Sequence, residues 1–170
     1  MTPKGIEIRH TDRLWIGGHW VAAHSGRMIE LVSPNSEQVI GSVAEADEAD
    51  MDAAVAAARA AFDFGPWPAM RPDERLAILK AMSGHLHARN AEIAMAWTLQ
   101  MGGLASFAGP MSAGSTMTLD GIIGMAENFA FVEKRPSHAV HTALVAYEPV
   151  GVVAGIAPWN GPYGIMLNKV

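Results

Sequence analysis

Few residues in this sequence could carry out covalent or acid–base catalysis, and the spacing of those residues excludes most such mechanisms. None of the 170 residues is cysteine, so the chain carries no thiolate nucleophile and no thiolate–metal site. His85 and His87 are two apart on an expected helix and point in different directions. His138 and His141 have no third ligand nearby. We therefore predict no metal site and interpret all seven histidines as solvated.

The motif that remains is Pro158-Trp159-Asn160, which follows a long apolar run. On residue type alone, Asn160 suits the cap of a following helix, because its side-chain oxygen can accept from free backbone N–H groups. The Asn160 amide could also contribute to a functional site, and one residue can have both roles. Trp159 has two similar interpretations, as a packing aromatic or a ligand-facing one. Gly151 and Gly155 lack the full GxGxxG fingerprint of a dinucleotide site.

Short strands are expected first. Apolar residues flank Gly17-Gly18, a dipeptide that readily takes positive φ, so residues 14–23 are predicted to form a β-hairpin. A second strand pair is predicted at 28–32 and 39–43, because the residues between them are typical of a turn.

Helices are expected next. Asp47 is predicted to be the N-cap of the first, and Glu48 and Asp50 are interpreted as a helix-start cluster and not as an acid–base pair. Its apolar stripe is Met51, Val55, Ala58 and Phe62. Pro72 suits the first turn of the second helix. The apolar stripe of that helix is Leu76, Leu79 and Met82.

Two further helices are predicted before the apolar run. Asn90 is expected to cap a helix over 91–101 that ends at Gly102-Gly103. A longer helix is predicted over 110–132. Its expected apolar side is Ile122, Met125 and Phe129.

The last third is expected to begin an α/β unit. Residues 142–147 are predicted to be extended. Val150–Ala157 is apolar on both faces, which is typical of a strand buried in a parallel sheet, and a helix is expected over 163–170. One strand cannot make a parallel sheet, and its neighbours would come after crossover helices. We therefore expect the chain to be incomplete.

Composition narrows the class of protein. Half of the residues are hydrophobic, and the net charge is −5 with no basic run, which argues against nucleic acid or an anionic membrane as a partner. The polar N-terminus lacks the apolar core of a signal peptide. The longest apolar stretch, 150–159, is shorter than the ~20 residues that span a bilayer. A cytoplasmic protein is expected.

The sequence resembles the NAD(P)-dependent aldehyde dehydrogenases, colinearly over nearly its whole length. The segments that carry the resemblance are LWIGGHWVAA, the alanine-rich helix ending in AARAAFDFGPW, and EPVGVVAGIAPWNGP. The resemblance implies an α/β fold, here an incomplete open Rossmann-like cofactor domain with an oligomerisation hairpin. Residues 1–136 would belong to the cofactor domain, 137–149 to the hairpin, and 150–170 to the first β–α unit of the nucleotide-binding sheet.

The resemblance also implies a reaction. Family members oxidise an aldehyde to a carboxylic acid with NAD or NADP through a cysteine thiohemiacetal, and a glutamate activates the water that releases the acid. Asn160 stands where the family places a donor to the oxyanion. The cofactor-lining positions correspond to Ile156, Ala157, Pro158 and Trp159.

Departures from the family pattern shape the functional hypotheses. Gly161 replaces a usually bulky residue and would widen the substrate side or loosen the turn. Gln100 stands where some members have an acidic residue near a structural cation, so no metal is predicted. Because the family's cysteine, glutamate and cofactor lysine are absent, we expect an N-terminal portion that is inactive alone. The alternatives are a non-catalytic interaction subunit, as a homo-oligomer or paired with a full-length paralogue, and a non-functional truncated product.

Overall fold

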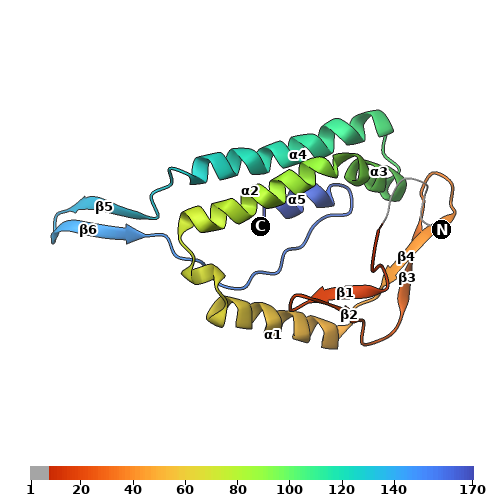
Figure 1. Cartoon of the computed structure of the whole chain (residues 1–170), viewed down its shortest axis with the longest axis horizontal. Coiled ribbons are helices and arrows are strands. Elements are labelled where there is room, and N and C mark those ends of the chain that lie inside the picture. Colours follow the sequence, from red (N-terminus) through yellow and green to blue (C-terminus); the bar gives the residue numbers. More distant parts are fainter. Residues whose placement is uncertain (1–7) are drawn as a thin grey trace.

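The computed structural model describes residues 8–170, which form helices and three two-stranded antiparallel sheets (Figure 1). The first seven residues of the predicted segment 1–136 lie outside this range. Strands β1 (Arg13–Ile16) and β2 (His19–Ala22) form the predicted hairpin, with Gly17 and Gly18 at φ of 60° and 83°. Strands β3 (Met28–Val32) and β4 (Val39–Ala44) form the second predicted pair.

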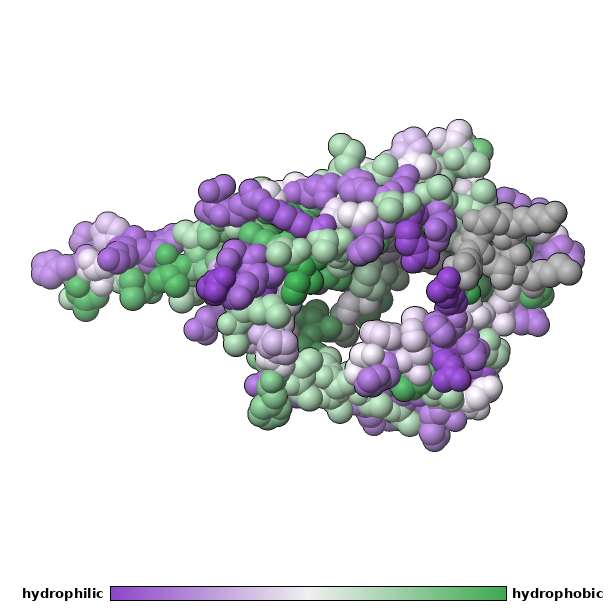
Figure 2. All heavy atoms as spheres, in the orientation of Figure 1, coloured by the Kyte–Doolittle hydropathy of each residue, from purple (hydrophilic) through white to green (hydrophobic). Residues whose placement is uncertain are grey.

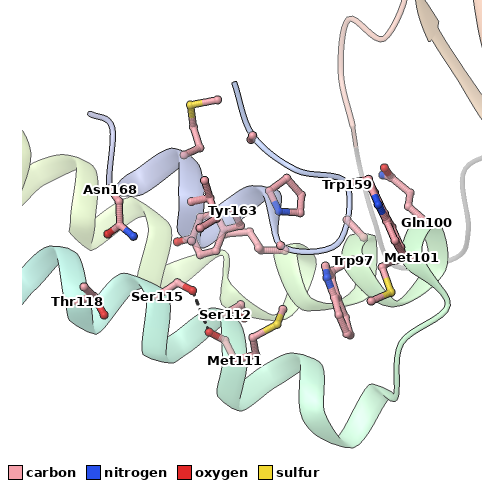
Figure 3. A pocket seen from close by; sticks show the side chains of 18 residues that line it. Trp97, Gln100, Met101, Met111, Ser112, Ser115, Thr118, Trp159, Tyr163 and Asn168 are labelled. Carbon is pink, nitrogen blue, oxygen red and sulfur yellow. Dashed lines mark hydrogen bonds between the residues drawn. The ribbon is translucent and has the colours of Figure 1, made fainter. Parts of the chain in front are cut away.

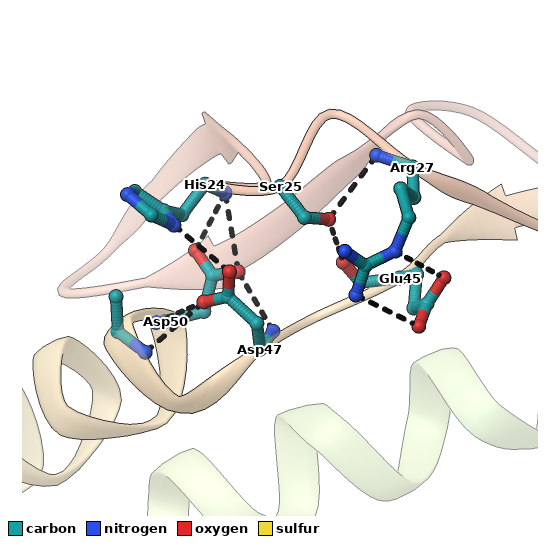
Figure 4. A network of polar contacts seen from close by, with 7 residues as sticks. His24, Ser25, Arg27, Glu45, Asp47 and Asp50 are labelled. Carbon is teal, nitrogen blue, oxygen red and sulfur yellow. Dashed lines mark hydrogen bonds and ion pairs between the residues drawn. The ribbon is translucent and has the colours of Figure 1, made fainter.

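Helix α1 (Glu48–Phe64) begins at the predicted N-cap, Asp47. The Asp47 carboxylate accepts from the backbone N–H groups of Ala49 and Asp50, and the Asp50 carboxylate accepts in return from the Asp47 N–H. The His24 backbone N–H donates to both Asp50 oxygens, at 3.0 and 3.1 Å (Figure 4). The start of α1 is therefore fastened to the chain that follows β2.

The remaining helices pack around α4 (Ala105–Ala126). A 3₁₀ turn, η1 (Trp67–Ala69), leads into α2 (Pro72–Ala88), which runs beside α4 (Figure 1). Helices α3 (Asn90–Met101) and α5 (Pro162–Leu167) also contact α4. The small apolar core lies where these helices meet. Its buried members are Leu119, Ile123 and Leu167, and the partly buried residues against them are Leu76, Leu79, Met82, Leu86 and Tyr163.

Helix α4 differs from its prediction in extent and in face. It starts at Ala105 and ends at Ala126, because Leu104 accepts its first hydrogen bonds and Pro110 lies in the second turn instead of the first. The predicted apolar side is exposed. The buried face consists of Ala108, Ser112, Thr116, Leu119 and Ile123. Two of these five residues, Ser112 and Thr116, are small and polar, so an apolar pattern alone does not find this face.

The predicted cap of α3 is wrong, and the capping interpretation of Asn160 is not met. The N-cap position of α3 is Arg89, and Asn90 lies inside the helix, where its side-chain oxygen accepts from Ser112 Oγ at 2.5 Å. The Asn90 amide, which was expected to cap α3, thus bonds to a residue of α4 instead. Gly161 is the N-cap of α5, without a side-chain cap, so Asn160 does not have that role either.

Strands β5 (Val132–Ser137) and β6 (His141–Ala146) form a hairpin that projects from one end of the molecule (Figure 1). Its first strand begins at Val132, within the residues expected to be helical and before the predicted hairpin segment, 137–149. The Tyr147 N–H donates to the Phe131 carbonyl at 2.9 Å and closes the base of the hairpin.

Residues 150–157 are not a strand, contrary to the prediction. Val150 is 94% exposed and Ile156 is 80% exposed. No other strand among residues 8–170 lies alongside this segment to accept its hydrogen bonds, and a strand exists only as part of a sheet. Of the predicted β–α unit, only the helix, α5, is formed.

Apolar side chains remain on the surface of this chain. Figure 2 shows a hollow between α1 and the helices above it, with hydrophobic residues on its left side and more hydrophilic residues on its right. On α1, Met51 and Val55 of the predicted stripe are more than half exposed, whereas the α2 stripe packs on α4 as predicted. Among residues 8–170, no helix is long and apolar enough to cross a membrane.

Candidate active site

The Pro158-Trp159-Asn160 turn is held in place by Trp97 of α3. The indole N–H of Trp97 donates to the backbone carbonyl of Asn160 at 2.9 Å. The Trp97 ring occupies the space beside Gly103, where a Cβ atom would lie 2.0 Å from the ring. Gly102, at φ 76°, ends α3 just before this point. The two glycines thus turn the chain and make room for the indole that fixes Asn160.

Helix α5 is fixed against α4 by polar and steric contacts. The Thr116 and Tyr163 hydroxyls form a hydrogen bond of 2.6 Å, and Thr116 is fully buried. One residue further on, Gly164 lies so close to α4 that an added Cβ would be 2.7 Å from Ser115 Oγ. These contacts define the position of the helix that starts directly after Asn160.

A cavity of about 730 Å³ lies between α3, α4 and α5 (Figure 3). Trp97, Trp159 and Tyr163 contribute aromatic walls, and Met101 and Met111 add thioethers. Among residues 8–170, no residue that lines the cavity is charged. The volume falls within the range of pockets that bind small organic molecules, roughly 300–1,000 Å³.

Most polar groups of the cavity wall already form hydrogen bonds within the protein. Ser112 donates to Asn90, and the hydroxyls of Ser115 and Thr118 donate to backbone carbonyls of their own helix. Gln100 and Asn168 supply the amide side chains of the lining. The described wall thus presents a mainly apolar surface that carries two amides and no charged side chain.

The predicted site residues lie in a single turn beside this cavity. Ala157 and Trp159 line it, and Trp159 is 79% exposed. Ile156, Pro158 and Asn160 are exposed and are not part of the lining. Asn160 lies between two lining residues, Trp159 and Gly161, and its carbonyl accepts from Trp97, which also lines the cavity.

The histidines are exposed as predicted, but two of them pair with carboxylates. The Asp120 carboxylate on α4 accepts from Ser83 and from His87 of α2, which lowers the pKa of Asp120. His24 Nδ1 lies 2.8 Å from Asp47 Oδ2, and this contact raises the pKa of His24 (Figure 4). Residues 8–170 contain no group of three His, Cys, Asp or Glu side chains that could hold a metal.

Comparison with known proteins identifies the family. The sequence model described as "Aldehyde dehydrogenase family" matches residues 20–170. This chain belongs to the aldehyde dehydrogenase family. It is 32% identical to the geranial dehydrogenase of Castellaniella defragrans over 160 residues, which are 94% of this chain and 34% of that protein. It is 36% identical to the 2-hydroxymuconic semialdehyde dehydrogenase of Pseudomonas sp. strain CF600, over 96% of this chain and 34% of that protein.

The fold agrees with the family. The crystal structure of the Mycobacterium tuberculosis aldehyde dehydrogenase complexed with NAD⁺ superposes with a TM-score of 0.87 and 36% sequence identity. The superposition covers 94% of this chain and 33% of that one. The chain thus spans about a third of the length of the relatives it matches. The expected membership in this family and the partial α/β fold are confirmed.

In this aldehyde dehydrogenase family member, sequence reasoning did not find the residues that hold the turn. Trp97 and Thr116 are 63 and 44 positions before Asn160 in the chain, and neither belongs to a recognisable motif. A usable signal existed at Gly103, because a second glycine after the helix end is not needed for the turn itself. A second signal is the Ser112–Thr116 spacing of four, which places two small hydroxyl side chains on one helix face.

Proposed function

We propose that these residues form one wall of the active site of an NAD(P)-dependent aldehyde dehydrogenase, an enzyme that oxidises an aldehyde to a carboxylic acid. The supporting observation is the position of Asn160: in a chain of this family, it is fixed by Trp97 at the rim of an apolar cavity. An amide at that rim can serve the carbonyl end of a substrate whose body lies in the cavity.

Asn160 would stabilise negative charge on the substrate oxygen. When a nucleophile adds to an aldehyde, the carbonyl oxygen becomes an oxyanion, and a fixed N–H donor lowers the barrier by stabilising that charge. One such donor contributes roughly 10²–10³ in rate. The hydrogen bond from Trp97 to the Asn160 carbonyl would serve this role by holding the backbone from which the amide extends.

The residues before Asn160 fit one face of a dinucleotide. Ile156 and Trp159 offer exposed apolar surface, and the backbone of 148–157 makes no hydrogen bond to another described residue. Such a surface suits a planar ring held by packing and by backbone contacts. When bound, NAD or NADP would supply the acceptor for the hydride that leaves the aldehyde carbon. The residues that would hold it here are Ile156, Ala157, Pro158 and Trp159.

The nucleophile must come from outside these 170 residues, since none of them is cysteine. We therefore expect no aldehyde-dependent NAD(P)H formation by this chain alone. Measurable turnover by the pure chain would contradict the proposed division of roles.

A chimera tests the role of Asn160. Residues 20–170 would replace the matched third of the M. tuberculosis aldehyde dehydrogenase, and NADH formation would be followed at saturating aldehyde. Asn160→Ala is expected to lower kcat by about 100-fold, with little change in KM for NAD⁺. Asn128→Ala, at an exposed asparagine outside the cavity lining, is the matched control. An Asn160→Ala chimera with the kcat of its parent would rule out Asn160 as the oxyanion donor.

The β5–β6 hairpin supports a second, compatible proposal: an oligomer, or pairing with a full-length relative. Val132 and Leu144 are 61% and 66% exposed and lie on the same face of the projecting hairpin. Exposed strand edges with apolar faces favour association. Light scattering tests association by comparing the mass of the wild-type chain with that of the double variant Val132→Lys, Leu144→Lys. The same mass for the wild type and the double variant would contradict the proposal.

A further inference from the structure

Asn160 is the only asparagine in the sequence that precedes a glycine. The other four asparagines are followed by serine, alanine, phenylalanine or lysine. The backbone nitrogen of the following residue can attack the side-chain carbonyl carbon of an asparagine, and a side chain on that following residue hinders the attack. Glycine has no side chain and the most permissive backbone. The Asn160-Gly161 dipeptide therefore has the composition that favours reaction of an asparagine with its own backbone.

The side chain of Asn160 is not restrained by the rest of the described chain. Asn160 is exposed, and its side-chain amide makes no hydrogen bond to any of residues 8–170. The amide of Asn90 gives a contrast, because its oxygen accepts from Ser112 Oγ at 2.5 Å and its nitrogen donates to the Gly109 carbonyl at 3.4 Å. The Asn90 amide must break these bonds before it can react, whereas the Asn160 amide has none to break.

The backbone nitrogen of Gly161 is equally accessible. Its N–H makes no hydrogen bond within residues 8–170, since α5 begins only at Pro162. A Cβ added at Gly161 would meet no atom within 4 Å beyond its chain neighbours, so this side of the peptide group is open. The carbonyl of the same peptide group, that of Asn160, accepts from the Trp97 indole N–H at 2.9 Å. This hydrogen bond draws electron density toward the oxygen and makes the N–H proton easier to remove.

We propose that Asn160-Gly161 is a site of self-modification, at which the chain converts its own asparagine to aspartate or isoaspartate. The Gly161 nitrogen forms a bond to Asn160 Cγ, and the bond from Cγ to the amide nitrogen breaks. The proton of the Gly161 N–H leaves with that amide nitrogen as ammonia, and a five-membered imide remains. Water then opens the imide at one of its two carbonyl carbons, which gives aspartate or isoaspartate. No co-reactant other than water is needed.

The modification changes what residue 160 can do. An amide nitrogen donates hydrogen bonds, whereas an ionised carboxylate only accepts them. The effect on activity rests on the proposed function, which needs a donor at Asn160: a carboxylate there places negative charge where the substrate oxygen becomes negative. Isoaspartate also adds a methylene group to the backbone next to the carbonyl that Trp97 holds. The age of each molecule would then limit its activity.

Mass spectrometry of the ageing 170-residue chain tests the modification without catalysis. Residue 160 is expected to exchange its NH₂ group for OH at a rate proportional to hydroxide concentration, and to give isoaspartate as well as aspartate. The rate should lie within about tenfold of that in the short peptide PWNGPYG, because the turn leaves both reacting groups free. The other four asparagines, which no glycine follows, are internal controls and should keep their amides for longer.

A glycine variant and a matched control test the nucleophile. Gly161→Ala is expected to slow the loss of the amide at least about tenfold, because its methyl group hinders the adjacent nitrogen. The fold tolerates this change, since the φ of −145° is accessible to alanine and the added Cβ meets open space. Gly84→Ala, whose Cβ also meets open space, should leave the rate at Asn160 unchanged.

Three results would overturn the proposal. The first is an Asn160 amide that persists in the folded chain while the peptide loses its own. The second is aspartate without isoaspartate, because direct hydrolysis of the amide by water gives aspartate alone. The third is an equal rate of loss in Gly161→Ala and Gly84→Ala.

The chimera separates this modification from the proposed function. As the Asn160 amide is lost, kcat should fall in step, by about 100-fold at complete conversion. Loss of the amide with an unchanged kcat would keep the modification and reject Asn160 as the oxyanion donor. Retention of the amide, together with a low kcat in Asn160→Ala, would reject the modification and keep the proposed function.

Discussion

The indole N–H of Trp97 donates to the backbone carbonyl of Asn160 at 2.9 Å, across 63 residues of chain. This bond joins the middle of the helical layer to the turn that carries the candidate site. The ring can take this position because Gly103 has no side chain: a Cβ there would lie 2.0 and 2.1 Å from ring atoms of Trp97. The position of Asn160 thus depends on two residues of an earlier helix–turn segment.

Gly103→Ala is predicted to displace Trp97 and release the Asn160 turn. The added methyl group cannot share space with the ring, so the indole must move and the hydrogen bond is lost. Hydrogen exchange of residues 159–161 should become faster, and the Asn160-dependent part of kcat in the chimera should fall about tenfold or more. Gly109→Ala, where an added Cβ meets no atom within 4 Å, is the control. Unchanged exchange in Gly103→Ala would contradict the arrangement.

Thr116→Val is predicted to destabilise the chain through Tyr163. Valine keeps the shape but removes the hydroxyl that pairs with the tyrosine oxygen at 2.6 Å. The expected loss in free energy of unfolding is about 1–3 kcal/mol, and Tyr163→Phe should cost less because Thr116 keeps its bond to the Ser112 carbonyl. Urea unfolding of both variants and of the double variant measures the coupling. Strictly additive losses would mean that the two hydroxyls do not interact.

Gly164→Ala is predicted to destabilise the contact of α5 with α4, and Ser115→Ala to rescue it. The new methyl would lie 2.7 Å from Ser115 Oγ, and overpacking of this kind costs about 1–3 kcal/mol. Without that oxygen the nearest remaining atom, Ser115 Cβ, is at 3.4 Å. The double variant should therefore recover most of the lost thermal stability. If Ser115→Ala brought no recovery, the clash would not be the cause.

The His24–Asp47 pair is predicted to make stability depend on pH. Its hydrogen bond with Asp47 raises the pKa of His24 above 6.5, so this contribution is complete below pH 6.5 and is lost as pH rises through the higher folded value. The same bond lowers the pKa of Asp47 below 3.8, so the Asp47 contribution is complete above pH 3.8 and is lost as pH falls through the lower folded value. The pair is strongest between these limits.

Melting curves of the wild type and of His24→Ala test this prediction. The difference in Tm should be largest between about pH 5 and pH 6 and should fade toward about pH 9. His19→Ala is the control, because His19 is exposed and makes no hydrogen bond to a carboxylate within residues 8–170. A Tm difference that is constant over this range would show that protonation of His24 is not involved.

Local signals predicted the start of this fold well. Gly17-Gly18 defined the first hairpin, and Asp47 with Asp50 defined the start of α1, since each of these features is decided by neighbours in the chain. The expected α2 stripe also packs as predicted, because its period matches the helix. These elements need no knowledge of distant residues.

Features decided by distant residues were predicted less well. Asn90 has a side chain suited to capping a helix, but it bonds to Ser112 instead. The buried face of α4 includes hydroxyl side chains, which a hydropathy scale assigns to the surface. Residues 150–157 have the composition of a buried strand but have no partner strand among residues 8–170. The Asn160 turn could be located from its motif, whereas Trp97 and Tyr163, which fix it, became apparent only in three dimensions.

The extended segment between the hairpin and α5 is anchored only near its ends. Tyr147 bonds to Phe131 at one end and Asn160 to Trp97 at the other, at 2.9 Å in each case. Between them, residues 148–157 leave both edges of the backbone unpaired within the described chain. The backbone N–H and C=O groups of this segment thus have no partner among the described residues. A second strand can add to either edge of this segment, because no existing backbone hydrogen bonds would have to break first.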